Sequence, residues 1–210
     1  MMNIGCILMA SGVSARYGRN KLLEEIDGRA VILHAADSLI GAGLAPLAVT
    51  RSAEVKALLD GAGIRCVLHD GPRKCDTMRV GLINLPADAA GYLFMPADQP
   101  LALPESLKRL VEAFLEDPSR AVRLGYGDAV GSPVIFPAAC REALMRYTGD
   151  RGGMDVLRTN RIPCKTVQSA HPWELWDIDT PEDMARIKAI KNHGCEEPVF
   201  IRRDRFTDTK

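Results

Sequence analysis

The chain has 210 residues, of which 47% are hydrophobic and 26% are charged, and its 27 basic residues balance its 27 acidic ones. These values lie near the averages for globular proteins, so they exclude a disordered chain, a fibrous repeat and a strongly basic nucleic-acid-binding protein. The length is enough for one domain with a sizeable core, and affinity for phosphate must come from a local group of charges.

The sequence also limits the cellular setting. No stretch approaches the roughly 20 apolar residues that span a bilayer, and the first residues lack the pattern of a secretory signal. We therefore expect a cytoplasmic protein with no membrane or nucleic-acid partner. The six cysteines include no C-x-x-C pair and should be reduced, mostly buried thiols, and the four scattered histidines show no zinc-site spacing.

The first expected element is a buried strand over residues 4–9 that leads directly into a loop of small residues. The strand is continuously apolar, as in a parallel sheet covered on both faces. Small side chains in the loop let backbone N–H groups approach an anion: Ala10, Ser11, Gly12 and Ser14. Arg16 and Lys21 then supply the positive charge that polyphosphate oxygens require. The plainer alternative is a turn flanked by solvated charges.

Strand-like and helical segments alternate up to residue 97, which predicts βαβ units and a parallel sheet. We expect helices over 30–42, 53–61 and 76–85, and strands over 45–49, 64–68 and 91–97. The last of these strands runs into Asp98. Ligands gather at the carboxyl ends of strands in open α/β sheets, so Asp98 is well placed for chemistry.

The second half of the chain is less regular. We expect helices over 104–116, 138–146 and 153–159, and strands over 130–136, 164–168 and 175–178. The segment Thr180-Pro181-Glu182-Asp183 predicts the start of a helix that runs to about Asn192, with threonine as the N-cap. Residues 193–210 are expected to be a tail without a catalytic part, so that one domain spans 1–192.

Asp98 and Asp179 each end an apolar run, so neighbouring positions in a sheet could bring them together. Mg²⁺ prefers one or two carboxylates together with phosphate oxygens and water. Such a pair suits nucleotidyl transfer, in which alignment and stabilisation of negative charge supply most of the catalysis. The alternatives are a helix cap for Asp179 and a turn into the next helix for Asp98.

Residues 8–23 resemble the signature L-A-A-G-x-S-x-R-x-G-x-x-K-L of nucleotidyltransferases that activate sugars, isoprenoid precursors and the molybdenum cofactor. The segments P-A-D-Q-P-L at 96–101 and W-D-I-D-T-P-E-D at 176–183 stand in the order found in molybdenum cofactor cytidylyltransferases and related MobA/MocA-type enzymes. The resemblance spans residues 4 to about 190. It implies a three-layer α/β/α, Rossmann-like fold with a mostly parallel central sheet.

The resemblance also implies roles for individual residues. Asp98 and Asp179 would bind Mg²⁺, and Arg16 and Lys21 would hold phosphates, so that these four form the catalytic set. The segment K-C-D-T-M-R-V-G-L at 74–82 resembles the family segment beside the base and ribose, although its acid and hydroxyl could merely cap a helix. The implied nucleotide contacts are Met9, Ala10, Ser11, Gly12, Ser14, Arg16, Lys21, Asp76, Thr77 and Asp98.

Two further segments resemble the part of the family that meets the second substrate. They are G-S-P-V-I-F at 131–136 and Y-T-G-D-R-G-G at 147–153. The implied contacts with the acceptor are Gly131, Ser132, Pro133 and Asp150. Many relatives have histidine where Ser132 stands, so the identity of the acceptor is less firmly indicated than the reaction.

The resemblance thus predicts an enzyme that transfers CMP from CTP to a molybdopterin-type acceptor and releases pyrophosphate, with a molybdoenzyme as candidate client. Guanylyl enzymes typically have L-A-G-G in the first loop and C-D-x-P at the acid, whereas this chain has A-S-G and D-Q-P. Three alternatives remain: a methylerythritol phosphate cytidylyltransferase, a GTP-using molybdenum cofactor guanylyltransferase, and a noncatalytic nucleotide-binding cofactor chaperone.

Overall fold

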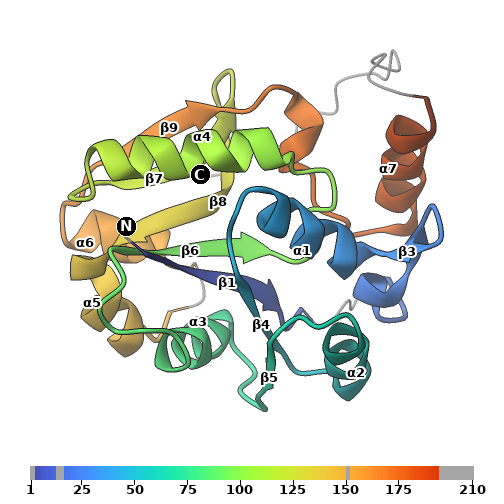
Figure 1. Ribbon diagram of the computed structural model, residues 1–210, viewed down its shortest axis with the longest axis horizontal. Helices are drawn as coiled ribbons and strands as arrows, with labels where there is room; N and C mark the ends of the chain where they lie inside the picture. The colour runs from blue at the N-terminus through green and yellow to red at the C-terminus, as the bar shows by residue number, and fades with distance from the viewer. Residues whose placement is uncertain (1–2, 13–16, 150–151, 194–210) are drawn as a thin grey trace.

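The computed structural model describes residues 3–12, 17–149 and 152–193. At its centre lies a seven-stranded sheet in the order β5-β4-β1-β6-β8-β7-β9 (Figure 1). The strands are β1 (Ile4–Ala10), β4 (Pro46–Thr50), β5 (Cys66–Leu68), β6 (Gly91–Pro96), β7 (Ala121–Tyr126), β8 (Ala129–Pro137) and β9 (Cys164–Gln168). Strand β8 runs antiparallel to β6 and β7, and the other neighbouring pairs are parallel. The predicted mostly parallel sheet is confirmed.

Helices cover both faces of this sheet (Figure 1). On one face lie α1 (Val31–Gly41), α2 (Ala53–Gly61), α4 (Pro104–Glu116) and α7 (Pro181–His193). On the other lie α3 (Lys74–Ile83), α5 (Arg141–Arg146) and α6 (Met154–Thr159). Successive residues of β1 alternate between the two cores, because Cys6 and Leu8 belong to the first and Ile7 to the second. A strand buried on both faces explains the uninterrupted apolar run.

Short elements complete the fold. The 3₁₀ turns are η1 (Lys21–Leu23), η2 (Ala138–Cys140) and η3 (Pro172–Leu175), and β2 (Glu25–Ile26) pairs with β3 (Arg29–Ala30) in a small hairpin. Figure 1 shows α7 beside α1 and this hairpin, and Lys191 Nζ of α7 lies 3.2 Å from His34 Nδ1 of α1.

The predicted strand over 175–178 is wrong. The chain forms η3 up to Leu175 and then an irregular segment, in which the Ile178 N–H donates to the Asp98 carbonyl at 3.1 Å. This contact joins the segment to the chain just after β6. The β2–β3 hairpin, strand β7 and the 3₁₀ turns η1 and η3 were not expected. The other expected helices and strands are confirmed, with ends that shift by a few residues.

The cysteines behave largely as expected. In the described part of the chain they are free thiols, and Cys6, Cys75 and Cys140 are buried, while Cys66 and Cys164 are partly exposed. Burial raises the pKa of the Cys66 and Cys140 thiols to about 11, so both stay protonated at neutral pH. None of the helices described is long and apolar enough to cross a bilayer.

Candidate active site

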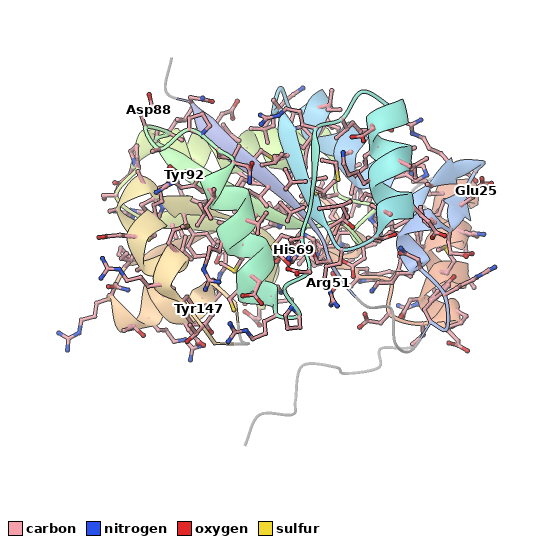
Figure 2. The ribbon with its side chains drawn as sticks, turned by 90° about the horizontal axis from the view of Figure 1, so that it is seen from below. Glu25, Arg51, His69, Asp88, Tyr92 and Tyr147 are labelled. Carbon is pink, nitrogen blue, oxygen red and sulfur yellow. The ribbon has the colours of Figure 1, made fainter. Side chains whose placement is uncertain are left out.

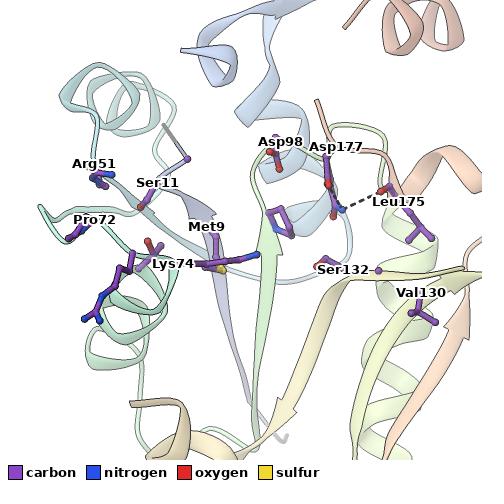
Figure 3. Close-up of a pocket in the computed structure, with 16 residues that line it drawn as sticks. Met9, Ser11, Arg51, Pro72, Lys74, Asp98, Val130, Ser132, Leu175 and Asp177 are labelled. Carbon is purple, nitrogen blue, oxygen red and sulfur yellow. Dashed lines mark hydrogen bonds between the residues drawn. The ribbon is translucent and has the colours of Figure 1, made fainter. Parts of the chain in front are cut away.

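A cleft of about 520 Å³ opens at the carboxyl ends of β1 and β6 (Figure 3). This is the edge where the sequence predicted chemistry, and it lies where open α/β sheets collect their ligands. Figure 3 shows Ser11, Arg51 and Pro72 on one side of the cleft and Asp98, Asp177 and Leu175 on the other. The lining residues are Met9, Ser11, Gly12, Arg51, Pro72, Arg73, Lys74, Thr77, Pro96, Asp98, Gln99, Val130, Gly131, Ser132, Leu175 and Asp177.

One end of the cleft, which we call the charged end, comprises Lys21, Asp98, Asp177 and Asp179. Lys21 Nζ lies 2.7 Å from Asp98 Oδ2 and 3.1 Å from Asp179 Oδ1, and the lysine side chain is only 8% exposed. Burial alone would lower the pKa of Lys21, but the two ion pairs outweigh it and raise that pKa. Lys21 therefore carries a permanent positive charge at this end.

The same geometry tests whether the charged end could hold a divalent cation. Two carboxylates converge on one cationic atom, which is the arrangement that Mg²⁺ needs when phosphate oxygens and water complete its ligands. In the described residues, no three acidic, histidine or cysteine side chains come together as a closed metal cage. The donor set fits a metal that shares its coordination with a bound phosphate, as Mg²⁺ does.

Asp177 adds a third carboxylate to the charged end. Asp177 is exposed as a whole residue, but its Oδ1 accepts a 2.8 Å hydrogen bond from Gln99 Nε2. Gln99 itself is only 2% exposed. Desolvation of the carboxyl group, together with the charge of Asp98, raises the pKa of Asp177 to about 6. The negative charges of Asp98 and Asp179 thus add to desolvation in favouring the protonated form of Asp177.

A buried acid holds the segment that carries Asp177 and Asp179 against the rest of the fold. Glu174 is fully buried, and its Oε1 accepts from the backbone N–H groups of Ala170 and His171 at 2.8 and 3.1 Å. Its Oε2 accepts from the Leu103 N–H at 3.1 Å, just before α4. Glu174 therefore ties this segment to the chain that follows β6 and Asp98.

A second acid caps the helix that follows. Asp183 Oδ2 accepts from the N–H groups of Asp179 and Thr180 at 3.2 and 3.0 Å, and the Asp183 N–H donates to Thr180 Oγ1 at 3.2 Å. The bond from the Asp183 N–H confirms Thr180 as the N-cap that the sequence predicted for α7. Thr180 and Asp183 thus share the capping, which leaves the carboxylate of Asp179 to pair with Lys21.

The opposite end of the cleft, which we call the hydroxyl end, comprises Ser11, His69 and Thr77. Ser11 Oγ donates to the Val49 carbonyl at 3.1 Å and lies 2.7 Å from His69 Nε2. Thr77 Oγ1 lies 3.3 Å from the same nitrogen. Burial, followed by the charge of Arg51, lowers the pKa of His69, and Figure 2 shows these two residues side by side. The hydroxyl end is therefore uncharged at neutral pH.

Basic side chains also line the cleft. Arg51 follows β4 directly, and Lys74 belongs to the first turn of α3; in the described part of the chain neither makes an ion pair. Figure 3 shows Lys74 reaching from α3 toward the middle of the cleft. Two cations without an acidic partner make this part of the cleft suitable for an anionic ligand.

The structure distributes the predicted site residues in three ways. Met9, Ser11, Gly12, Thr77, Asp98, Gly131 and Ser132 line the cleft, and Lys21 and Asp179 join it through Asp98. Ala10 and Pro133 are not among the described residues that line it, and neither is Asp76. Ser14, Arg16 and Asp150 lie outside the described residues.

Asp76 caps the start of α3, which the sequence analysis gave as the alternative to a nucleotide contact. Its Oδ2 accepts from the Arg73 N–H at 3.0 Å, and its Oδ1 from Arg79 Nη1 at 3.1 Å. These hydrogen bonds, with the Arg73 backbone contact first, lower the pKa of Asp76. Asp76 thereby orients the first turn of α3, which presents Lys74 and Thr77 to the cleft.

Several residues in or behind the cleft were not expected from the sequence: Arg51, Gln99, Leu175 and Asp177 line it, and His69 lies behind Ser11 and Thr77. Two of them could have been found, because Arg51 and His69 directly follow β4 and β5. The carboxyl ends of neighbouring parallel strands meet at the same edge of a sheet, so the argument that selected Asp98 applies to both. Gln99 and Asp177 depend on the irregular segment after η3, which no periodicity indicates.

Comparison with known proteins agrees with this geometry. Residues 6–167 match the model of the MobA-like NTP transferase domain. The chain belongs to this family. As its fold and family indicate, it is a nucleotidyltransferase of the MobA-like type.

Individual relatives are distant but cover nearly the whole chain. A probable molybdenum cofactor guanylyltransferase of Pyrococcus furiosus is 24% identical over 200 residues, which cover 90% of this chain and 98% of the relative. The crystal structure of Rv0371c from Mycobacterium tuberculosis has a TM-score of 0.77 and 25% identity, and covers 90% of this chain and 99% of its own. A nucleotidyl transferase from Methanothermobacter thermautotrophicus has a TM-score of 0.78 at 23% identity, with 89% and 96% covered.

Proposed function

We propose that this protein transfers CMP from CTP to a molybdopterin-type acceptor that bears a phosphate, with release of pyrophosphate and with Mg²⁺ as its metal. The observation that carries the proposal is the convergence of Asp98 and Asp179 on Lys21 at the carboxyl edge of the sheet. A buried lysine and paired carboxylates at the end of a cleft suit the binding of a metal–triphosphate complex.

The two ends of the cleft suggest how CTP would lie. The triphosphate belongs at the charged end, where Lys21 and, by resemblance, Arg16 offset its negative charge. The base belongs at the hydroxyl end, where Ser11 and Thr77 can form hydrogen bonds with it. This orientation leaves the side lined by Gly131, Ser132 and Leu175 for the acceptor.

In this arrangement the residues of the chain perform alignment and charge stabilisation. Mg²⁺ held by Asp98 and Asp179 would supply neutralisation of the phosphate oxygens when bound. The Lys21 ammonium would then be released from its two carboxylates and could donate hydrogen bonds to phosphate oxygens instead. The acceptor phosphate attacks the α-phosphorus, the bond to the β-phosphate oxygen breaks, and pyrophosphate leaves with the bond's electron pair.

Two observations bear on the finer assignments. The M. tuberculosis protein has also been solved in complex with manganese, which supports a divalent cation in a relative of this fold. The P. furiosus relative is named for guanylyl transfer, which favours GTP, whereas Ala10-Ser11-Gly12 and Asp98-Gln99-Pro100 favour CTP on sequence grounds. GTP is therefore the second candidate nucleotide.

The test is a matrix of pyrophosphate-release assays with Mg²⁺, in which each of CTP, GTP, ATP and UTP is combined with molybdopterin or with methylerythritol phosphate. We expect pyrophosphate from CTP and molybdopterin. Release with GTP but not with CTP would show that the protein is a guanylyltransferase. Release with methylerythritol phosphate but not with molybdopterin would show that methylerythritol phosphate is the acceptor. Binding of nucleotide without any release would favour a noncatalytic chaperone.

A further inference from the structure

The hydrogen bonds at the hydroxyl end determine which atoms donate. A serine hydroxyl has one proton, and that of Ser11 goes to the Val49 carbonyl, which can only accept. With that assignment, the 2.7 Å contact between Ser11 Oγ and His69 Nε2 is made by a proton on the histidine, and Thr77 Oγ1, 3.3 Å from the same nitrogen, can only share that proton. His69 is thus the tautomer with the proton on Nε2, and it donates to Ser11.

The other ring nitrogen agrees with this assignment. His69 Nδ1 is buried and has no hydrogen-bond partner in the part of the chain that the structure describes. A protonated Nδ1 would bury a donor without an acceptor, whereas in the Nε2–H form Nδ1 carries only a lone pair. The charges that act on the ring are those of Arg51, Asp76 and Asp70.

These bonds limit what Ser11 can offer to a ligand. Its proton is committed to Val49, and one lone pair receives the His69 proton, so the hydroxyl that lines the cleft can only accept one more hydrogen bond. His69 does not itself appear among the residues that line the cleft, although both of its hydroxyl partners do. It acts from behind them.

We propose that His69 is a positioning residue that holds Ser11 Oγ as a hydrogen-bond acceptor, so that the site selects a nucleotide whose base presents an exocyclic amino group at this edge. The inference rests on the proposed function, because it takes the hydroxyl end as the site of the base. The 4-amino group of cytosine donates to Ser11. The 4-oxo group of uracil and the 6-oxo group of guanine would place one acceptor against another.

The consequence is a preference that arises from one hydrogen-bonding network and not from the size of the pocket. A keto group opposite Ser11 leaves two polar atoms without partners once water is excluded, which we expect to weaken binding at least about tenfold. UTP is the sharpest competitor, because it has the same ring size as CTP and differs from it on this edge.

The test measures binding of CTP, UTP and GTP in the presence of Mg²⁺ by isothermal titration calorimetry. The wild type should bind CTP at least about tenfold more tightly than UTP. His69→Leu removes one of the two hydrogen bonds that fix the Ser11 side chain, so the hydroxyl can turn away from Val49 and donate to a keto group. The ratio of CTP to UTP affinity should therefore fall to within about threefold. His69→Gln keeps an N–H donor and should restore most of the preference.

Two controls separate this role from a general loss of structure. Ser11→Ala should lower the ratio as His69→Leu does, because it removes the acceptor. His34→Gln changes a histidine on α1 that bonds to the Ile26 carbonyl, far along the chain from the hydroxyl end, and should leave the ratio unchanged. A circular dichroism melt of each variant shows whether it is folded.

A second measurement needs no ligand. The ¹⁵N chemical shifts of the His69 ring should show a protonated Nε2 and an unprotonated Nδ1 at pH 7.5. A protonated Nδ1, or a CTP-to-UTP ratio that does not change in His69→Leu, would overturn the inference while leaving nucleotidyl transfer intact. If none of the three nucleotides binds, the proposed function is overturned, and the preference for CTP with it.

Discussion

The two ends of the cleft are built in different ways. The charged end collects Lys21, Asp98 and Asp179 from distant parts of the chain and depends on Glu174 to hold one of those parts in place. The hydroxyl end uses residues that directly follow or begin regular elements, and it carries no ion pair among its members. Charge at one end and neutral hydrogen bonding at the other suit a ligand that is itself charged at one end only.

The largest effect is expected from removal of Asp98, which pairs with Lys21 at the charged end. Asp98→Ala should lower magnesium-dependent pyrophosphate release by about 1,000-fold or more, because a bound metal provides several kcal/mol of transition-state stabilisation. Asp179→Ala should act in the same direction. Asp60→Ala is the matched control, since Asp60 forms an exposed ion pair on α2. Activity of Asp98→Ala within a few-fold of the wild type would refute the assignment.

Glu174→Ala tests how the charged end is assembled. The change removes the charged acceptor of three partly buried backbone N–H groups, so the free energy of unfolding should fall by about 3 kcal/mol. Urea denaturation measures this, with Glu116→Ala as a surface control that should change stability by less than about 0.5 kcal/mol. If Glu174→Ala unfolds at the same urea concentration as the wild type, Glu174 does not brace this segment.

Lys21→Ala removes the positive charge while leaving both acids in place. The rate of pyrophosphate release should fall by about 100-fold, because a preorganised charge beside the developing anion is worth a few kcal/mol in the transition state. Lys56→Ala, an exposed lysine on α2, is the control. A change in thermal stability alone, with an unchanged rate, would make Lys21 a structural residue.

The smallest expected effect is the contribution of His69 to the pH dependence of the free energy of unfolding. Because the pKa of His69 is lowered in the folded protein, the folded state binds fewer protons than the unfolded chain just below the usual histidine value of 6.5. Acidification through this window should therefore reduce the free energy of unfolding, and at higher pH the contribution is fully present. His69→Gln should remove part of this slope when urea melts at pH 7.5 and 5.5 are compared. An equal slope in both proteins would show that His69 does not titrate as described.

The sequence predicted the first half of the fold well because its strands are continuous apolar runs separated by amphipathic helices. Strand β7 was missed because V-R-L-G-Y places an arginine and a glycine inside the strand, and its pairing with β9 joins residues far apart in the sequence. The segment after Leu175 resembles a strand in composition, yet Ile178 is buried without a strand ladder, and Glu174 fixes the preceding turn.

In the candidate site, too, the residues that stand in a local sequence pattern were predicted, and those that only tertiary contacts bring to the site were not. Asp98 and Lys21 stand in patterns whose chemistry is visible locally, and the structure brings them within 2.7 Å of each other. His69 is one of four histidines with no motif around it, and only the tertiary contact with Ser11 distinguishes it. Asp177 differs from an ordinary surface acid only because the fold places it beside Gln99 and Asp98.

Under the proposed function, the charged end binds the metal and phosphates while the hydroxyl end binds the base. The most direct test is an NMR titration of the ¹⁵N-labelled wild-type protein with CTP, first with Mg²⁺ and then with paramagnetic Mn²⁺. We predict that Mn²⁺ strongly broadens the backbone signals of Lys21, Asp98 and Asp179. CTP should shift the signals of Ser11 and Thr77, and Mn²⁺ should broaden these two less. Broadening centred on Ser11 and Thr77, or CTP shifts confined to the charged end, would contradict the account.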